Sequence, residues 1–147
     1  ATTRAPRKGE VDGVNYFFLT REEFDRRVAN GEFVEWAEVH GNCYGTLVSE
    51  VTSKLASGAS LILEIDVQGA LQVKERFPEA VLIFIKPPSL EVLRERLVET
   101  PETIELRMAN AADELALADR YDDVVVNDDL DRATDELVRV LDMHERN

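Results

Sequence analysis

Hydrophobic and polar positions follow different patterns in two parts of the chain. Residues 1–47 hold short aromatic and apolar runs between turn residues, which is typical of a small sheet. Residues 48–147 hold apolar runs that alternate with stretches of helical periodicity, which is typical of an α/β fold with a parallel sheet. The pattern therefore predicts a sheet-rich subdomain followed by an α/β core.

The first part is predicted to contain two strands around a short helix. The strands are expected at residues 16–19 and 33–39, and the second ends before a turn at residues 41–42. Thr20 followed by Glu23 forms a capping box, in which the threonine is the N-cap of the helix between the strands. This part has no long helix and is expected to form a lid over a pocket.

The second part is predicted to contain three strands, each followed by a helix. The strands are expected at residues 61–65, 81–85 and 124–126. The run at residues 81–85 is apolar throughout, as in a parallel strand that is buried on both faces. Residues that can cap the following helices are Asp66, Ser89, Thr100 before a proline, and Asp129 or Asp131.

The composition excludes several classes of protein. No apolar run approaches the length of a membrane span and nothing resembles a secretory signal, so we expect a cytoplasmic protein without a membrane partner. Cys43 is the only cysteine, which excludes an internal disulfide. The formal net charge of -13 argues against binding to a nucleic acid polymer, but it leaves room for one anion-binding pocket.

Basic residues stand out at the start of this acidic chain. Arg4 and Arg7 flank a stiff Ala5-Pro6 pair, since proline fixes its own φ and keeps the preceding residue extended. Two guanidinium groups on a non-helical segment can grip one phosphate from two sides. The alternative interpretation is a basic tail with no binding role.

Several motifs occur in one order along the whole chain. They are Thr2-Thr3-Arg4-Ala5-Pro6-Arg7-Lys8-Gly9-Glu10, Phe33-Val34-Glu35-Trp36-Ala37, Tyr44-Gly45-Thr46, Ile65-Asp66-Val67-Gln68-Gly69 and Val126-Asn127-Asp128. With these motifs the chain resembles guanylate kinase, which moves phosphate from ATP to GMP with Mg²⁺. The resemblance implies a P-loop-kinase-like parallel sheet core flanked by helices, at residues 48–147, and a small mixed-sheet GMP-binding subdomain at residues 1–47.

Glu35 is the candidate that reads the base. It is predicted to share a strand face with apolar residues, and a buried carboxylate there needs a partner because an unpaired charge is costly. The N1–H and N2 amino group of guanine are adjacent donors that a carboxylate accepts as a pair, whereas adenine lacks this pair. The alternative is an exposed strand glutamate. The resemblance adds Thr46 as a second contact to guanine and Asp66 as a GMP-binding residue, although a carboxylate directly after a strand also serves as a helix cap.

The resemblance also implies the phosphate-binding and catalytic residues. Arg4, Arg7, Tyr16 and Tyr44 match positions that bind the phosphate of GMP, although both tyrosines alternatively serve as core residues. Arg7, Arg96 and Arg107 match arginines expected to stabilise the transferred phosphoryl group. For Arg96 and Arg107 the alternative is surface ion pairing. Asn127 matches a position near the adenine of ATP.

The chain departs from the family pattern in several places. No glycine lies in the GK[ST] context of a P-loop, so we expect the first strand, the P-loop and the first helix to be absent, and this chain alone not to turn over ATP at a normal rate. The lid at residues 96–108 is short, Glu64 replaces an aspartate, and Ala1 replaces a serine. Alternative functions are a non-catalytic guanylate-kinase-like module that binds phosphorylated peptide or GMP, and a catalytically dead remnant.

Overall fold

The computed structural model describes residues 1–145, which form two compact units. Unit 1 is Ala1–Pro78 and unit 2 begins at Glu79. This structural division follows contacts within the chain and differs from the functional division at residue 47, which stays a prediction. In both units helices combine with two-stranded sheets, so the α/β class is confirmed.

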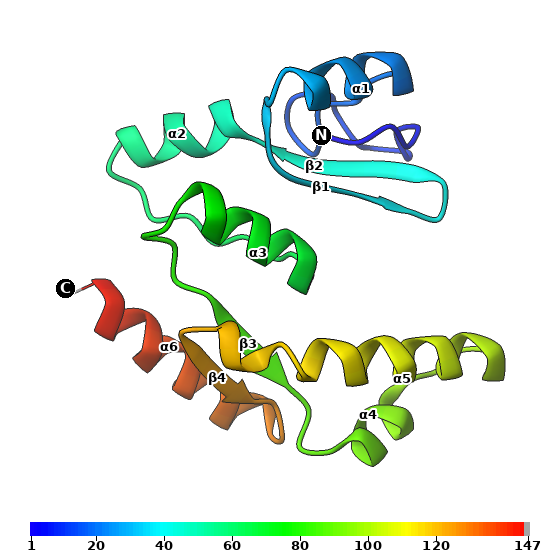
Figure 1. The fold of residues 1–147 in the computed structure, drawn as a ribbon, viewed down its shortest axis with the longest axis vertical. Helices are drawn as coiled ribbons and strands as arrows, with labels where there is room; N and C mark the ends of the chain where they lie inside the picture. The colour runs from blue at the N-terminus through cyan, green and yellow to red at the C-terminus, as the bar shows by residue number, and fades with distance from the viewer. Residues whose placement is uncertain (146–147) are drawn as a thin grey trace. The chain divides into compact units, whose positions relative to one another are not determined.

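Unit 1 is built around an antiparallel β-hairpin (Figure 1). Its helices and strands are α1 (Arg21–Ala29), β1 (Phe33–Val39), β2 (Asn42–Leu47), α2 (Val48–Ala56) and α3 (Val67–Arg76). The hairpin turn lies at His40 and Gly41, both with positive φ (50° and 79°), and not at residues 41–42. Asn42 already pairs with Val39, so it is a strand residue. A two-residue loop with both φ values positive suits the twist of a hairpin.

The predicted strand at residues 16–19 is wrong. This segment makes single bridges, one of them between Thr2 and Phe18, and the backbone N–H groups of Thr2 and Leu19 donate to Phe17 O and Thr2 O at 3.0 and 2.9 Å. The pairing stops after Thr2 because the chain bends at Thr3 and Arg4. Thr2 also bridges Tyr44, and it thereby joins the start of the chain to β2.

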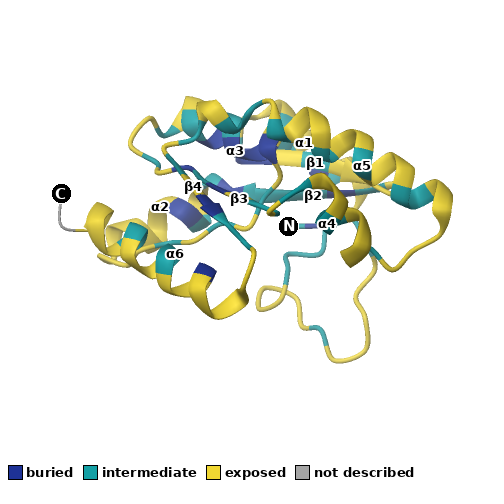
Figure 2. Cartoon of the chain, turned by 90° about the horizontal axis from the view of Figure 1, so that it is seen from below, coloured by how far each residue is buried: buried dark blue, intermediate teal, exposed yellow. Residues whose placement is uncertain are grey.

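The core of unit 1 lies between α1 and the hairpin. Phe24 stacks on Phe33 with ring centroids 4.4 Å apart, and Cys43 and Leu47 complete the buried cluster. Burial raises the pKa of the Cys43 thiol, which therefore acts as a packing residue. Figure 2 shows that exposed positions predominate on the helices and that buried positions are confined to parts of some elements.

Asp66 opens α3, but the predicted strand before it is wrong. The Asp66 carboxylate accepts the N–H of Gly69 at 2.8 Å, which confirms its capping role. Residues 61–65 form no strand, and Ile62 is 72% exposed. A strand needs a neighbour to pair its backbone groups, and none lies beside this segment within residues 1–145.

Unit 2 has a two-stranded parallel sheet with helices around it. Its elements are β3 (Ile83–Lys86), α4 (Leu90–Arg96), α5 (Pro101–Leu115), the 3₁₀ turn η1 (Ala118–Arg120), β4 (Asp123–Val126) and α6 (Leu130–Glu145). The predicted caps Ser89, Thr100 and Asp129 are confirmed, because each side chain accepts a backbone N–H of the first helical turn. Full burial of residues 81–85 is wrong: Ile85 is 55% exposed, since both strands of a two-stranded sheet are edge strands.

None of the helices in residues 1–145 combines the length and apolar character needed to cross a membrane.

Candidate nucleotide-binding site

Glu35 is buried inside unit 1, with a relative exposure of 7%. It pairs across the hairpin with Thr46, whose hydroxyl donates to Glu35 Oε1 at 2.7 Å. A bulge after Phe33 interrupts the alternation of buried and exposed positions in β1. Three successive residues, Phe33 to Glu35, are therefore buried. Burial of this carboxylate is confirmed, and the alternative of an exposed strand glutamate is wrong. A buried carboxylate that keeps one oxygen for further donors suits a ligand with adjacent N–H groups.

The second carboxylate of the site comes from the start of α3. A Cβ atom added to Gly69 would lie 3.0 Å from Glu35 Oε2 and 3.1 Å from Asp66 Oδ1, so both carboxylates border this glycine. The absence of a side chain at Gly69 lets them approach the same piece of backbone. The helix is held against β1, since Trp36 N–H donates to Gln72 Oε1 at 3.3 Å and Arg76 Nη1 donates to Phe33 O at 3.2 Å.

Arg4, Tyr16 and Tyr44 form a second group of predicted residues in unit 1. The Arg4 guanidinium lies over the Tyr16 ring, 5.4 Å from its centroid, and the two tyrosine rings meet edge to face at 6.3 Å. Thr2 places this group, because its buried hydroxyl accepts the Arg4 N–H at 3.2 Å and donates to Cys43 O at 2.9 Å. A cation beside two phenols is a suitable surface for a phosphate.

Glu10 holds the Arg4 side chain. Its two carboxylate oxygens accept from Arg4 Nη1 and Nη2 at 3.1 and 2.9 Å, and Oε2 also accepts the backbone N–H of Arg7 at 2.7 Å. The hydrogen bond to Arg4 is the main cause that lowers the pKa of Glu10, and the same bond raises the pKa of Arg4. Glu10 is therefore the anionic partner of the basic segment, through its bonds to the Arg4 side chain and the Arg7 backbone.

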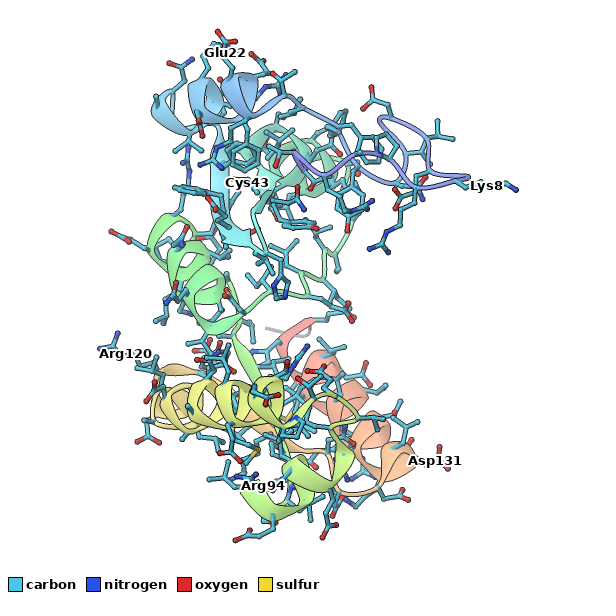
Figure 3. All side chains as sticks on the ribbon, turned by 90° about the vertical axis from the view of Figure 1, so that its right-hand side faces the viewer. Lys8, Glu22, Cys43, Arg94, Arg120 and Asp131 are labelled. Atoms are coloured by element: carbon cyan, nitrogen blue, oxygen red, sulfur yellow. The ribbon has the colours of Figure 1, made fainter. Side chains whose placement is uncertain are left out.

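Arg7 and Lys8 lie on an exposed loop between these contacts. Figure 3 shows the Lys8 side chain extending away from the tip of this loop. The Glu10 N–H donates back to Arg7 O at 3.0 Å, so the loop is closed by reciprocal bonds. Glu10 thus connects the backbone of Arg7 with the guanidinium of Arg4.

The predicted residues of unit 2 fall into two places. Arg96 donates from Nη1 to Asn127 O at 2.7 Å and from Nη2 to Asp128 O at 3.1 Å, so the end of α4 contacts the residues that follow β4. Arg107 on α5 is paired with Glu99 at 2.8 Å. The alternative of a surface ion pair is thus confirmed for Arg107. Arg96 instead donates to backbone carbonyl groups.

Glu10, Gly69 and Thr2 contact or border the candidate residues, and the sequence did not single them out individually. Glu10 and Gly69 were visible as ends of the motifs that carry Arg4 and Asp66. An acid that follows Arg4 by six residues and Arg7 by three in one loop is a signal for an ion pair that orders these arginines. Among residues 1–145 there is no group of three or more histidine, cysteine, aspartate or glutamate residues placed to share a metal ion.

This α/β protein combines the buried Glu35, the exposed Asp66 and an arginine–tyrosine group, an arrangement that suits the class of proteins that bind the base and the phosphate of a nucleotide. Residues 1–144 match the sequence profile described as guanylate kinase. The chain is 55% identical to the guanylate kinase of Gloeobacter violaceus and 52% identical to that of Halalkalibacterium halodurans, over 96% of this chain and 71% of each relative.

A solved structure agrees with these relatives. The crystal structure of guanylate kinase from Anaplasma phagocytophilum superposes with a TM-score of 0.77 at 41% identity, over 99% of this chain and 73% of that chain. The chain belongs to the guanylate kinase family, the enzymes that transfer a phosphoryl group from ATP to GMP. The resemblance read from the motifs is confirmed.

Proposed function

We propose that unit 1 binds GMP with Glu35, Thr46 and Asp66 at the base and Arg4, Arg7, Tyr16 and Tyr44 at the phosphate. The observation that carries this proposal is the burial of Glu35 with one oxygen bonded to Thr46. The second oxygen borders Gly69 together with Asp66. Two carboxylates at one place favour a ligand that brings several donors, and the guanine edge with N1–H and N2 amino group does so.

Strand β2 supports both ends of the proposed site. Tyr44 and Thr46 are two residues apart, so their side chains lie on the same strand face, about 7 Å from each other. Cys43 and Leu47 point to the opposite face, into the core. Base and phosphate contacts are thus fixed by one rigid strand, which sets the distance between the two ends of the ligand.

Phosphoryl transfer adds the residues of unit 2. Arg96 and Arg107 are proposed to neutralise charge on the transferred group, together with Arg7, and Asn127 to lie near the adenine of ATP. Mg²⁺ is proposed to enter bound to ATP and to neutralise its phosphates. Transfer of a phosphoryl group depends mainly on positioning and charge, which is why arginines are the residues proposed for it.

Calorimetric titration of the unmodified chain with GMP and AMP tests the proposal. GMP is expected to bind at least about ten-fold more tightly, because adenine would leave a buried acceptor unpaired at a cost of about 1–3 kcal/mol. Glu35→Gln should remove most of this preference, and Glu38→Gln, on the same strand but exposed, should keep it. Equal affinities for GMP and AMP, or tighter binding of a phosphoserine peptide than of GMP, would contradict the proposal.

A further inference from the structure

We propose that Glu10 is a positioning residue, which orients Arg4 and the Arg7 backbone for the phosphate; the proposal rests on the proposed function. Three N–H groups converge on one carboxylate: Nη1 and Nη2 of Arg4 and the backbone N–H of Arg7. The side chains of Arg4 and Glu10 are only 14% and 19% exposed. This pair is therefore better shielded from solvent than the surface ion pairs of α1, such as Arg21 with Asp25 at 53% and 56% exposure.

The hydrogen bonds select one edge of the Arg4 guanidinium. Glu10 takes the end of the group, through one hydrogen each of Nη1 and Nη2, and Ala5 O accepts the other Nη1 hydrogen at 2.9 Å. The Nε–H and the second Nη2–H remain, and they point in the same direction along the side of the group. Such a parallel pair fits two oxygens of one phosphate.

The tyrosine group lies beside this guanidinium. Arg4 lies over Tyr16, and hydrogen bonding with Tyr44 is a smaller cause of the raised pKa of Arg4. Glu10 thus binds the end of the Arg4 guanidinium and leaves the Nε–H and the second Nη2–H for the ligand. Without this carboxylate, binding would have to immobilise a long side chain, and that ordering lowers affinity.

The opposite role for Glu10 is a carboxylate that competes with phosphate for Arg4. A competitor would have to leave before GMP binds, so its removal would raise affinity. The geometry favours positioning, because Glu10 makes two further bonds to the loop. Its carboxylate accepts the Arg7 N–H, and its own backbone N–H donates to Arg7 O. Such a carboxylate stays in place when the side edge of Arg4 receives a phosphate.

The test combines a ligand-free measurement with a binding measurement. In the unmodified chain, the Arg4 Nε–Hε group should give an NMR resonance with a high heteronuclear NOE, and Glu10→Gln should lower that NOE. GMP affinity should fall about three- to ten-fold in Glu10→Gln, with guanosine affinity unchanged. Glu22→Gln, which removes a like charge from the outer face of α1 (Figure 3), should change neither.

A double-mutant cycle separates positioning from a general structural role. In an Arg4→Ala background, Glu10→Gln should no longer lower GMP affinity, because Glu10 is proposed to act through Arg4. An undiminished effect in that background, a gain in GMP affinity, or an Arg4 NOE that stays high in Glu10→Gln would overturn the proposal. If Glu10→Gln fails to fold, Glu10→Asp, which keeps the charge but shortens the side chain, provides the same measurements.

The two proposals fail in different ways. Equal binding of GMP and guanosine by the unmodified chain would contradict a phosphate site and hence the proposed function. The ligand-free NOE comparison still decides the positioning role in that case, because it reports only whether Glu10 orders Arg4.

Discussion

Gly69→Ala is the sharpest test of the base end of the site. The new methyl group would lie 3.0 Å from Glu35 Oε2, 3.1 Å from Asp66 Oδ1 and 3.4 Å from Ile65 Cβ. Contacts this short force the neighbours to move by a few tenths of an ångström. Glu35 has little freedom to do so, because its other oxygen is bonded to Thr46 at 2.7 Å and the residue is buried.

The stability of the variant should change little, since two effects oppose each other. Alanine is favoured over glycine inside a helix by about 0.8–1 kcal/mol. Pushing the Glu35 side chain off its rotamer costs about 0.5–1.5 kcal/mol. The binding site has no such compensation, because the methyl group displaces a carboxylate from the place where base donors would meet it. A poorly satisfied buried acceptor costs about 1–3 kcal/mol, which corresponds to a loss of GMP affinity of about ten-fold or more.

Urea unfolding and calorimetric titration measure the two quantities on the same protein. We expect the free energy of unfolding of Gly69→Ala to stay within about 1 kcal/mol of the unmodified chain, and GMP and guanosine to lose affinity equally, since the damage is at the base. Gln68→Ala, one residue earlier and exposed, is the matched control and should bind GMP normally. Unchanged GMP affinity in Gly69→Ala would refute the placement of guanine between Glu35 and Asp66.

Two further predictions concern stability. Gly45→Ala would place a methyl group 2.6 Å from Phe33 Cδ1 and 3.0 Å from the Glu35 carbonyl oxygen, and overpacking of this kind should lower the free energy of unfolding by about 1–3 kcal/mol in urea; an equally stable variant would show that the hairpin yields at this point. Hydrogen bonds from Arg26 and then Arg27 lower the pKa of Glu23 from 4.5 to about 2, so its stabilising effect should be complete above pH 4.5 and disappear as the pH falls towards 2. Glu23→Gln should therefore be less stable than the unmodified chain at pH 6, and this difference should disappear below pH 2; a difference that persists there would contradict this cause.

Helix starts were predictable from the sequence because capping is local. Thr20, Asp66, Ser89 and Thr100 each bond to a backbone N–H three residues later, so the residue type and its position are sufficient. The strand expected at residues 61–65 failed for the opposite reason. An apolar run shows that a segment can pair, but a strand exists only where another segment supplies the ladder.

The candidate site was predictable in its residues but not in its geometry. The motifs named Arg4, Glu35 and Asp66 through the family resemblance, and the hairpin register then placed Glu35 opposite Thr46. The edge of the guanidinium that Glu10 occupies could not be predicted from the sequence, because it depends on how the loop closes around Arg7. The orientation of a side chain depends on the combined energy of several weak contacts, and this energy does not follow from the spacing of residues in the sequence.

The charges of unit 1 also explain how an acidic protein can select an anion. With a net charge of -13, the whole chain repels GMP at long range, but this repulsion is screened beyond about 10 Å at ordinary ionic strength. Within that distance, the arrangement of charges along the proposed site determines how GMP is oriented. Glu35 and Asp66 at one end repel a phosphate, whereas Arg4 at the other end accepts one, so GMP can enter the proposed site in only one direction. The same carboxylates that are proposed to bind the base would therefore set the orientation of GMP that phosphoryl transfer requires.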